Sequence, residues 1–456
     1  MGSLNYEHKN IFLYADDEKK RAIREYAVGY MRFIDEAKTE REAVSYLVKR
    51  AEEAGYTPFS FGETLKVGDK KYVNNRNKSL YLLRVGSEDV GKNGVRILAA
   101  HIDSPRLDLK QNPLFEKDEI AFFKTHYYGG IKKYQWATIP LALHGVVHLA
   151  DGTKVTVKIG DDEGDPVFYV SDLLPHLASK QMGKPLSEAI DGESLNVWVG
   201  ATPSESEEKN RFSYAALELL HEKYGMKEED FLCAELCAVP AFRAREIGLD
   251  RALIGAYGQD DKVCSYPQFT ALTENDDGVH TVIAVFADKE EIGSEGTTGM
   301  QTELFDDLLR AVADSFGANE AEMRANSMCL SGDVSASYDP QFPEVYDKRN
   351  ATFLSHGAGV MKYTGARGKS GSNDAGAEYL HKIRAIFAEN GVQWQTGELG
   401  KVDAGGGGTL AKYMARRNID TLDIGVPVVS MHSPYEVVSK ADLYEDHLAF
   451  KAFIKG

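Results

Sequence analysis

Residue types that bind metal ions in proteins stand at the ends of several apolar runs in this sequence. The first run, RILAAHID, ends in His101 and Asp103; TVIAVFADK leads to the pair Glu290-Glu291, and NSMCLSG to Asp333. Imidazole nitrogens and carboxylate oxygens are ligands that zinc, manganese and cobalt accept. The pattern predicts a hydrolase that uses divalent metal ions.

Two further groups fit this hypothesis. His432 ends the run VPVVSM, and the acidic pair Asp260-Asp261 stands in the turn GAYGQDDK. Ligands of open α/β sheets bind beyond the carboxyl ends of the strands, so four strand exits would bring these side chains to one edge. Two ions there would lie roughly 3.5–4 Å apart and hold a bridging hydroxide.

Neighbouring residues in these motifs suit different roles. A metal-bound imidazole usually donates its second N–H to a carboxylate, and Asp103 is close enough in sequence to serve His101 in this way. Glu290 and Glu291 would diverge on an extended chain, so one can bind metal while the other takes a proton from water. Each group alone is more often an ordinary solvated or structural side chain; only their combination carries the prediction.

Composition limits the class of protein. The chain has 456 residues, a net charge of −17 and four cysteines. This length indicates two domains or one domain with an insertion. The negative charge argues against nucleic acid or an anionic membrane as partner. The polar N-terminus, the lack of a membrane-length apolar run and the few cysteines, expected as buried free thiols, predict a cytoplasmic protein.

Periodicity divides the chain into three stretches. Residues 17–37 have helical spacing of apolar groups, and Thr39 with Glu42 forms a capping box before a second helix that Gly55 would end. Residues 110–227 contain short β-branched and aromatic runs separated by Gly, Asp and Pro. Strand-like and helix-like segments alternate on both sides of this stretch.

We therefore expect an α/β fold. A three-layer catalytic domain with a mostly parallel central sheet would comprise residues 1–109 and 228–456, and a smaller β-rich domain, residues 110–227, would interrupt it. The segment FLCAELCAVP is expected in the catalytic domain.

Several motifs together resemble the M18 family of metallo-aminopeptidases, which includes the aspartyl aminopeptidases. They are AAHIDSP, YYGG…W…LALHG, DKEEIGSEG, SGDVSAS and VSMHSPYE, in this order over most of the chain. The resemblance implies that the β-rich insertion is a dimerisation domain. It also implies a homo-oligomer built from dimers, possibly of twelve subunits.

The resemblance further implies the roles of the site residues. The metal ligands would be His101, Asp260, Glu291, Asp333 and His432. Asp260 would bridge both ions, although the turn here reads Gln-Asp-Asp where the family has Leu-Asp-Asn, which leaves Asp261 as the alternative. Glu290 would be the general base and Asp103 would orient His101.

The substrate residues also follow from the resemblance. The segment GGGGTL resembles the Gly-rich substrate loop of the family and offers Gly407, Gly408 and Thr409 to the peptide backbone. His176, in SDLLPHLA, matches a histidine that the family places near the active site of a neighbouring subunit. Lys362 precedes YTGARG instead of the Asn-Gln-Arg-Tyr-like segment of the aspartyl enzymes. A preference for acidic N-terminal residues is therefore an open expectation.

The leading prediction is removal of N-terminal residues from short peptides with two divalent ions, zinc before cobalt or manganese. A related two-metal deacylase of N-acyl amino acids is an alternative, because it needs no free amine on its substrate. A non-catalytic assembly protein with a structural metal site is a third reading. Structural zinc sites are commonly rich in thiolates, whereas this ligand set contains no cysteine.

Overall fold

The computed structural model describes residues 4, 8–207, 209–275 and 278–456. Contacts divide the chain into two compact units. The first unit comprises Met1–Asp103, Ala244–Met431 and Tyr435–Gly456, and the second comprises Ser104–Arg243 and His432–Pro434. Among the described residues, no helix combines the length and apolarity that crossing a bilayer requires.

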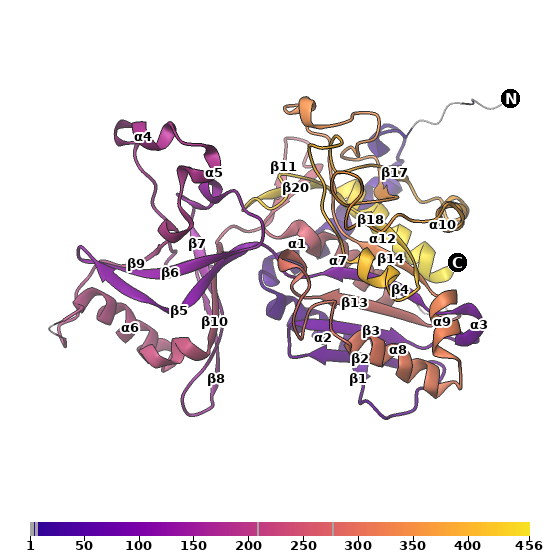
Figure 1. Ribbon diagram of the computed structural model, residues 1–456, viewed down its shortest axis with the longest axis horizontal. Coiled ribbons are helices and arrows are strands. Elements are labelled where there is room, and N and C mark those ends of the chain that lie inside the picture. The colour runs from indigo at the N-terminus through magenta and orange to yellow at the C-terminus, as the bar shows by residue number, and fades with distance from the viewer. Residues whose placement is uncertain (1–3, 5–7, 208, 276–277) are drawn as a thin grey trace. The chain divides into compact units, whose positions relative to one another are not determined.

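A nine-stranded sheet forms the centre of the first unit (Figure 1). Its strands, in spatial order, are β1 (Thr57–Pro58), β2 (Lys70–Asn75), β3 (Ser79–Arg84), β13 (Val282–Ala287), β4 (Arg96–His101), β14 (Met328–Gly332), β18 (Asp420–Gly425), β16 (Ala358–Met361) and β17 (Trp394–Thr396). The central strands β13, β4, β14 and β18 run parallel to their neighbours in this group. The predicted, mostly parallel sheet is confirmed.

Helices cover both faces of this sheet. The helices of the first unit are α1 (Asp17–Glu36), α2 (Glu40–Glu53), α3 (Val90–Asn93), α7 (Gln259–Thr273), α8 (Leu304–Ser315), α9 (Glu320–Asn326), α10 (Ala377–Glu389), α11 (Ala411–Ala415) and α12 (Lys440–Lys455), with short 3₁₀ turns η1 (Ile11–Leu13), η6 (Glu290–Ile292) and η7 (Pro343–Val345).

Alternation along the strands explains the three layers. On β13, Ala284 and Phe286 pack in one core cluster with α1, α2, α7, α10 and α12. Ile283 and Val285 point to the opposite face and pack in a second cluster with α8, α9 and α11. A strand that is buried on both faces reads as a continuous apolar run, as VIAVFA does.

A second, smaller sheet of the first unit has five strands. They are β11 (Arg245–Ile247), β12 (Leu253–Ala256), β20 (Glu436–Ser439), β19 (Pro427–Val429) and β15 (Ser335–Ala336). The sequence pattern predicts the strand before His432 in the large central sheet. This prediction is wrong, because that strand, β19, belongs to the small sheet.

The second unit is built on a six-stranded sheet. Its strands are β8 (Lys154–Ile159), β7 (Leu141–His148), β10 (Ala234–Pro240), β5 (Arg106–Lys117), β6 (Ile120–Tyr128) and β9 (Val197–Gly200). Its helices are α4 (Ser179–Met182), α5 (Leu186–Ala189) and α6 (Arg211–Tyr224), with 3₁₀ turns η2 (Lys133–Trp136), η3 (Pro175–Leu177), η4 (Gly192–Ser194) and η5 (Glu228–Cys233).

Two local predictions need correction. The segment FLCAELCAVP, expected in the catalytic domain, supplies β10, which pairs antiparallel with β7 and β5 of the second unit. All four cysteines are free, but only three are buried, because Cys233 is exposed at the end of η5.

Candidate metal centre

Three neighbouring parallel strands deliver candidate ligands to one edge of the central sheet. The strand β4 lies between β13 and β14. His101 is the last residue of β4, in register with Ala287 at the end of β13, and Asp333 follows the last residue of β14. The carboxyl ends of parallel strands share an edge, so these side chains meet although the sequence separates them widely.

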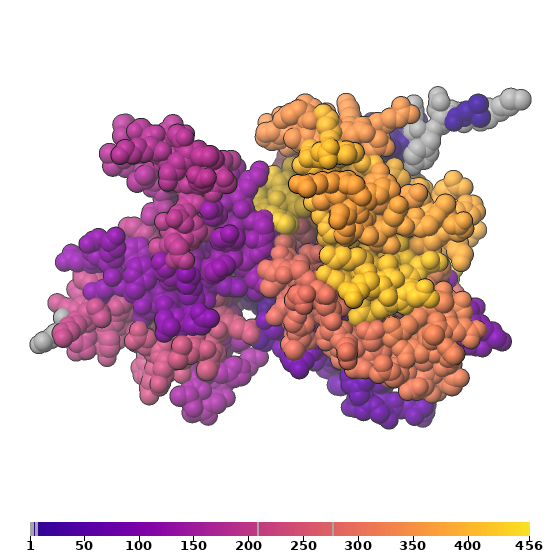
Figure 2. Space-filling view, viewed as in Figure 1, coloured from indigo at the N-terminus to yellow at the C-terminus, as the bar shows by residue number. Residues whose placement is uncertain are grey.

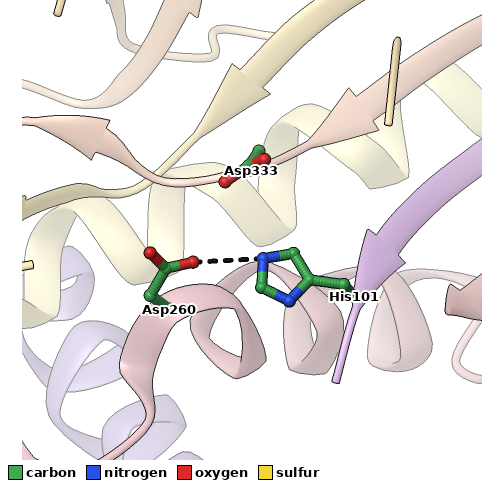
Figure 3. Close-up of side chains that lie close together, drawn as sticks. All are labelled: His101, Asp260 and Asp333. Atoms are coloured by element: carbon green, nitrogen blue, oxygen red, sulfur yellow. Dashed lines mark ion pairs between the residues drawn. The ribbon is translucent and has the colours of Figure 1, made fainter. Parts of the chain in front are cut away.

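The innermost group of the site consists of His101, Asp260 and Asp333 (Figure 3). Each offers one ligand atom, and these atoms all lie within 4.8 Å of one another. Nε2 of His101 lies 3.1 Å from Oδ1 of Asp260, which comes from the first turn of α7. All three residues are buried, so the ligand atoms are withdrawn from bulk water.

Asp103 connects the end of β4 to the turn η6. One of its carboxylate oxygens, Oδ1, lies 3.4 Å from Nδ1 of His101. The backbone N–H groups of Glu290 and Glu291 donate to Oδ1 and Oδ2 of Asp103 at 3.1 and 3.3 Å. Nδ1 of His101 also lies 3.1 Å from the backbone carbonyl oxygen of Asp103. Asp103 thus contacts both the imidazole and the backbone that carries the two glutamates, and its role in orienting a metal-bound His101 stays a prediction.

Glu290 and Glu291 lie next to the inner group. The Oε2 atom of Glu290 is 4.0 Å from Nε2 of His101. A carboxylate oxygen of Glu291 lies within 4.8 Å of one of Asp260. Two adjacent residues of η6 therefore lie close to the inner group, Glu290 near His101 and Glu291 near Asp260.

The two members of the acidic pair have different surroundings. Asp260 lies in the inner group, whereas Oδ2 of Asp261 accepts the backbone N–H of His101 at 3.3 Å. Asp261 is fully buried and holds the end of β4 in place. This arrangement favours Asp260 over Asp261 as the ligand.

The electrostatics of the site call for added positive charge. Burial and the neighbouring Asp261 raise the pKa of Asp333 well above its ordinary value. Burial alone would lower the pKa of His101, but the carboxylates of Asp103 and Asp260 outweigh it and raise that pKa well above the usual range. A crowded, buried set of carboxylates with one imidazole is a donor set that fits divalent zinc.

His432 has surroundings of its own. It belongs with the second unit, where its Nδ1 atom lies 2.8 Å from the backbone carbonyl oxygen of Gly130. Its role as a ligand remains a prediction. In sequence it stands between Met431 and Tyr435, which both belong to the first unit.

The predicted substrate residues differ in their exposure to solvent. Gly407 and Gly408 are exposed, but Thr409 is buried and its hydroxyl donates to Oδ1 of Asp423 on β18 at 2.6 Å. Lys362 is exposed directly after β16. His176 is exposed in η3 of the second unit. Contact of these residues with a peptide stays a prediction.

Sequence reasoning missed two groups that shape the site. Asp261 was considered only as an alternative ligand, and Asp423 was not considered at all. Asp423 lies in the run TLDIG, where a charged residue inside a strand that is buried on both faces was an available signal.

A three-layer α/β unit with imidazole and carboxylate groups at the ends of parallel strands favours a metal-dependent hydrolase. Residues 33–454 match the family model described as aminopeptidase I zinc metalloprotease (M18). The chain therefore belongs to the M18 family of zinc metalloproteases.

Known relatives support this assignment. A probable M18 family aminopeptidase 1 of Clostridium acetobutylicum is 48% identical, and the match covers 99% of this chain and 98% of that protein. The crystal structure of an M18 family aminopeptidase from Thermotoga maritima is 43% identical over 99% of each chain, with a TM-score of 0.94. The mApe1 dodecamer of Saccharomyces cerevisiae is 18% identical over 96% of this chain and 97% of that chain, has a TM-score of 0.78 and shows the fold alone. The protein is an aminopeptidase, as the family description and the names of these relatives indicate. This finding disfavours the deacylase and the non-catalytic assembly protein.

Proposed function

We propose that this aminopeptidase removes N-terminal residues from short peptides with two divalent ions, most simply zinc. The ligands are His101, Asp260, Glu291, Asp333 and His432, and Asp260 is shared by both ions. The observation that carries the proposal is the convergence of His101, Asp260 and Asp333 within 4.8 Å beside Glu290.

The side chains around the ions have distinct tasks. When bound, the ions supply Lewis-acid chemistry that activates a water molecule and polarises the scissile carbonyl. Glu290 takes a proton from that water and passes it to the leaving amine nitrogen. Burial raises the pKa of Glu290 above its ordinary value. Asp103 holds the imidazole of His101 and the backbone of Glu290 in their relative positions.

Replacing the general base while keeping its shape tests this assignment. Glu290→Gln should retain two zinc ions per chain by mass spectrometry and lose activity by about 10²–10⁴-fold, the usual contribution of a general base. Asp306→Asn is a suitable control, because it makes the same chemical change at a carboxylate that pairs with Arg324 and Arg417. Full activity in Glu290→Gln would remove Glu290 from the mechanism.

The substrate is proposed to need a free N-terminal amine, and its backbone is proposed to contact Gly407, Gly408 and Thr409. A preference for acidic N-terminal residues forms a separate part of the proposal and depends on the charge of Lys362. Aminoacyl substrates with N-terminal Asp, Glu, Leu and Ala should be compared after loading with zinc, cobalt or manganese. If wild type and Lys362→Met hydrolyse acidic and neutral substrates in the same ratio of rates, only the proposed acidic preference is contradicted. If N-acetylated peptides are hydrolysed as fast as free peptides, the aminopeptidase reaction itself is contradicted.

Residues 110–227 are proposed to form a dimerisation domain within a homo-oligomer. The mApe1 dodecamer of Saccharomyces cerevisiae supports this proposal at the level of the fold. In the second unit, the surface segment 167–186 exposes large apolar side chains (magenta in Figure 2). They are Val167, Tyr169, Leu173, Leu174, Leu177, Met182 and Leu186.

The oligomer proposal gives His176, in the same segment, a role at the active site of a neighbouring subunit. Light scattering should report a mass that is a multiple of the dimer, and a monomer would contradict the proposal. His176→Ala should lower kcat at unchanged oligomer mass. Unchanged kcat in an intact oligomer would remove His176 from the active site.

A further inference from the structure

The Gly-rich loop 405–408 is attached to the central sheet by one buried hydrogen bond. Thr409 follows this loop, and its hydroxyl donates to Oδ1 of Asp423 at 2.6 Å. Thr409 is 8% exposed and Asp423 is fully buried. The loop glycines themselves carry no side chains, so Thr409 is the nearest residue whose side chain can fix the position of the loop.

Asp423 occupies a strand between two parts of the candidate site. Its strand, β18, lies between β14 and β16. Asp423 is in register with Ser331 on β14 and with Met361 on β16. The strand β14 leads to the candidate ligand Asp333, and β16 leads to Lys362. A hydrogen bond from Thr409 to β18 therefore fixes the loop relative to both Asp333 and Lys362.

The other side of the loop rests on the segment 362–371. The carbonyl oxygen of Gly407 accepts the backbone N–H of Gly365. Gly406 has φ +141°. A Cβ atom at this position would clash with the carbonyl oxygen of Gly365 and with Ala366. The loop backbone is thus packed closely on one side, and the hydroxyl of Thr409 ties it to the sheet on the other.

Burial of the Asp423 carboxyl group costs free energy, which indicates that this residue has a role other than filling the core. Burial raises the pKa of this carboxyl group to about 7, and hydrogen bonds from the side chains of Thr409 and Ser331 act against the rise. An apolar residue would fill this strand position at lower cost, because burying a carboxyl group is unfavourable.

We propose that Asp423 is a positioning residue for peptide binding, which acts through Thr409 to hold the Gly-rich loop at the edge of the sheet. The inference rests on the proposed substrate role of this loop. The effect of Asp423 is to fix loop backbone groups, through Thr409, in the conformation that binds the peptide main chain. Loss of the anchor should weaken substrate binding more than the chemical step.

Steady-state kinetics of the zinc-loaded full chain test the inference. Thr409→Val keeps the volume and removes the hydroxyl, and KM for a peptide substrate should rise about tenfold, the effect of one lost hydrogen bond to a charged group, while kcat changes less. Thr409→Ser restores the hydroxyl and should recover most of this loss. Thr270→Val is the matched control, since Thr270 is 6% exposed and its hydroxyl contacts Tyr26 and His447 instead of the loop.

A double-mutant cycle tests whether the two residues act through each other. Asp423→Leu should raise KM as much as Thr409→Val, and the double variant should be no worse than either single variant, because all three lack the same bond. Hydrogen exchange should show faster exchange of loop amides in Thr409→Val and unchanged exchange there in Thr270→Val.

The outcomes separate the inference from the proposed function. Additive effects, or a wild-type KM in Thr409→Val, would overturn the inference while wild-type aminopeptidase activity stands. A failure of the proposed two-metal chemistry would instead appear in the wild type and in Glu290→Gln, whatever the loop variants do.

Discussion

Asp103→Asn removes a charge from the point where the proposed metal ligand His101 and the turn η6 are joined. The asparagine is nearly isosteric, so the fold should persist. It keeps one oxygen acceptor, however, and places an NH₂ group where the second carboxylate oxygen was. Either the N–H of Glu290 or the N–H of Glu291 must then lose its carboxylate acceptor, whereas Nδ1 of His101 keeps the backbone carbonyl oxygen of residue 103 at 3.1 Å.

The contacts set the size of the expected effect. A hydrogen bond to a charged group contributes about 1.5–3 kcal/mol, and each 1.4 kcal/mol corresponds to about a factor of ten. Loss of one such bond predicts a 10–100-fold decrease in zinc affinity or in kcat/KM. Replacement of carboxylates that orient metal-binding histidines in other proteins has effects of about the same size.

Zinc affinity can be measured by competition with a chromophoric chelator, and kcat/KM with an aminoacyl substrate at saturating zinc. The control is Asp306→Asn, which changes a carboxylate of the same unit that pairs with Arg324 and Arg417. Its zinc affinity should equal that of the wild type. Wild-type zinc affinity together with wild-type kcat/KM in Asp103→Asn would refute the role assigned to Asp103.

Three further predictions concern stability. Chelation should lower the thermal midpoint and zinc should restore it, because an ion that binds only the folded state at 1,000 times its Kd adds about 4 kcal/mol; an unchanged midpoint would argue against a metal centre in the folded core. The folded pKa of Asp423, about 7, exceeds the ordinary value of 3.8, so its ionisation destabilises the fold as pH rises from about 4 to 7. Asp423→Asn should therefore remove a pH-dependent loss of up to about 4 kcal/mol over this window in urea unfolding, and parallel pH profiles of variant and wild type would contradict the assignment. Thr39→Ala breaks the capping box with Glu42 and should lower the free energy of unfolding by about 1 kcal/mol, whereas an unchanged value would show that the cap adds nothing.

Local sequence signals predicted the helices of the N-terminal region well. Helical spacing over 17–37 corresponds to α1, and the capping box of Thr39 and Glu42 begins α2. Gly55, expected as the stop, has φ +87° just after that helix. These features depend on residues close together in the chain, so the sequence contains the whole of their cause.

Pairing between distant strands was less accessible. The run FLCAELCAVP has the composition of a buried strand, and composition does not distinguish the sheet of one unit from that of the other. The run before His432 raised the same difficulty, since its strand β19 pairs with β15 and β20 in the small sheet. Strand partners depend on the packing of the whole chain.

The candidate site shows the same division. Residue type and strand-end position were sufficient to nominate His101 and Asp333, whereas Asp260 was chosen from the acidic pair Asp260-Asp261 by the family resemblance. The bonds from Asp103 to η6 and from Asp261 to the backbone of His101 join segments more than 150 residues apart in sequence. Such bonds leave no local pattern, because any buried acidic residue near a strand end has the same sequence signature.

The central claim is that two ions lie at the carboxyl ends of β4 and β14. Anomalous diffraction at the zinc edge from crystals of the zinc-loaded protein tests this claim most directly. We predict two peaks about 3.5–4 Å apart, with Asp260 between them and the remaining ligands His101, Glu291, Asp333 and His432 around them. A single peak, or peaks that lie away from His101 and Asp333, would contradict the account.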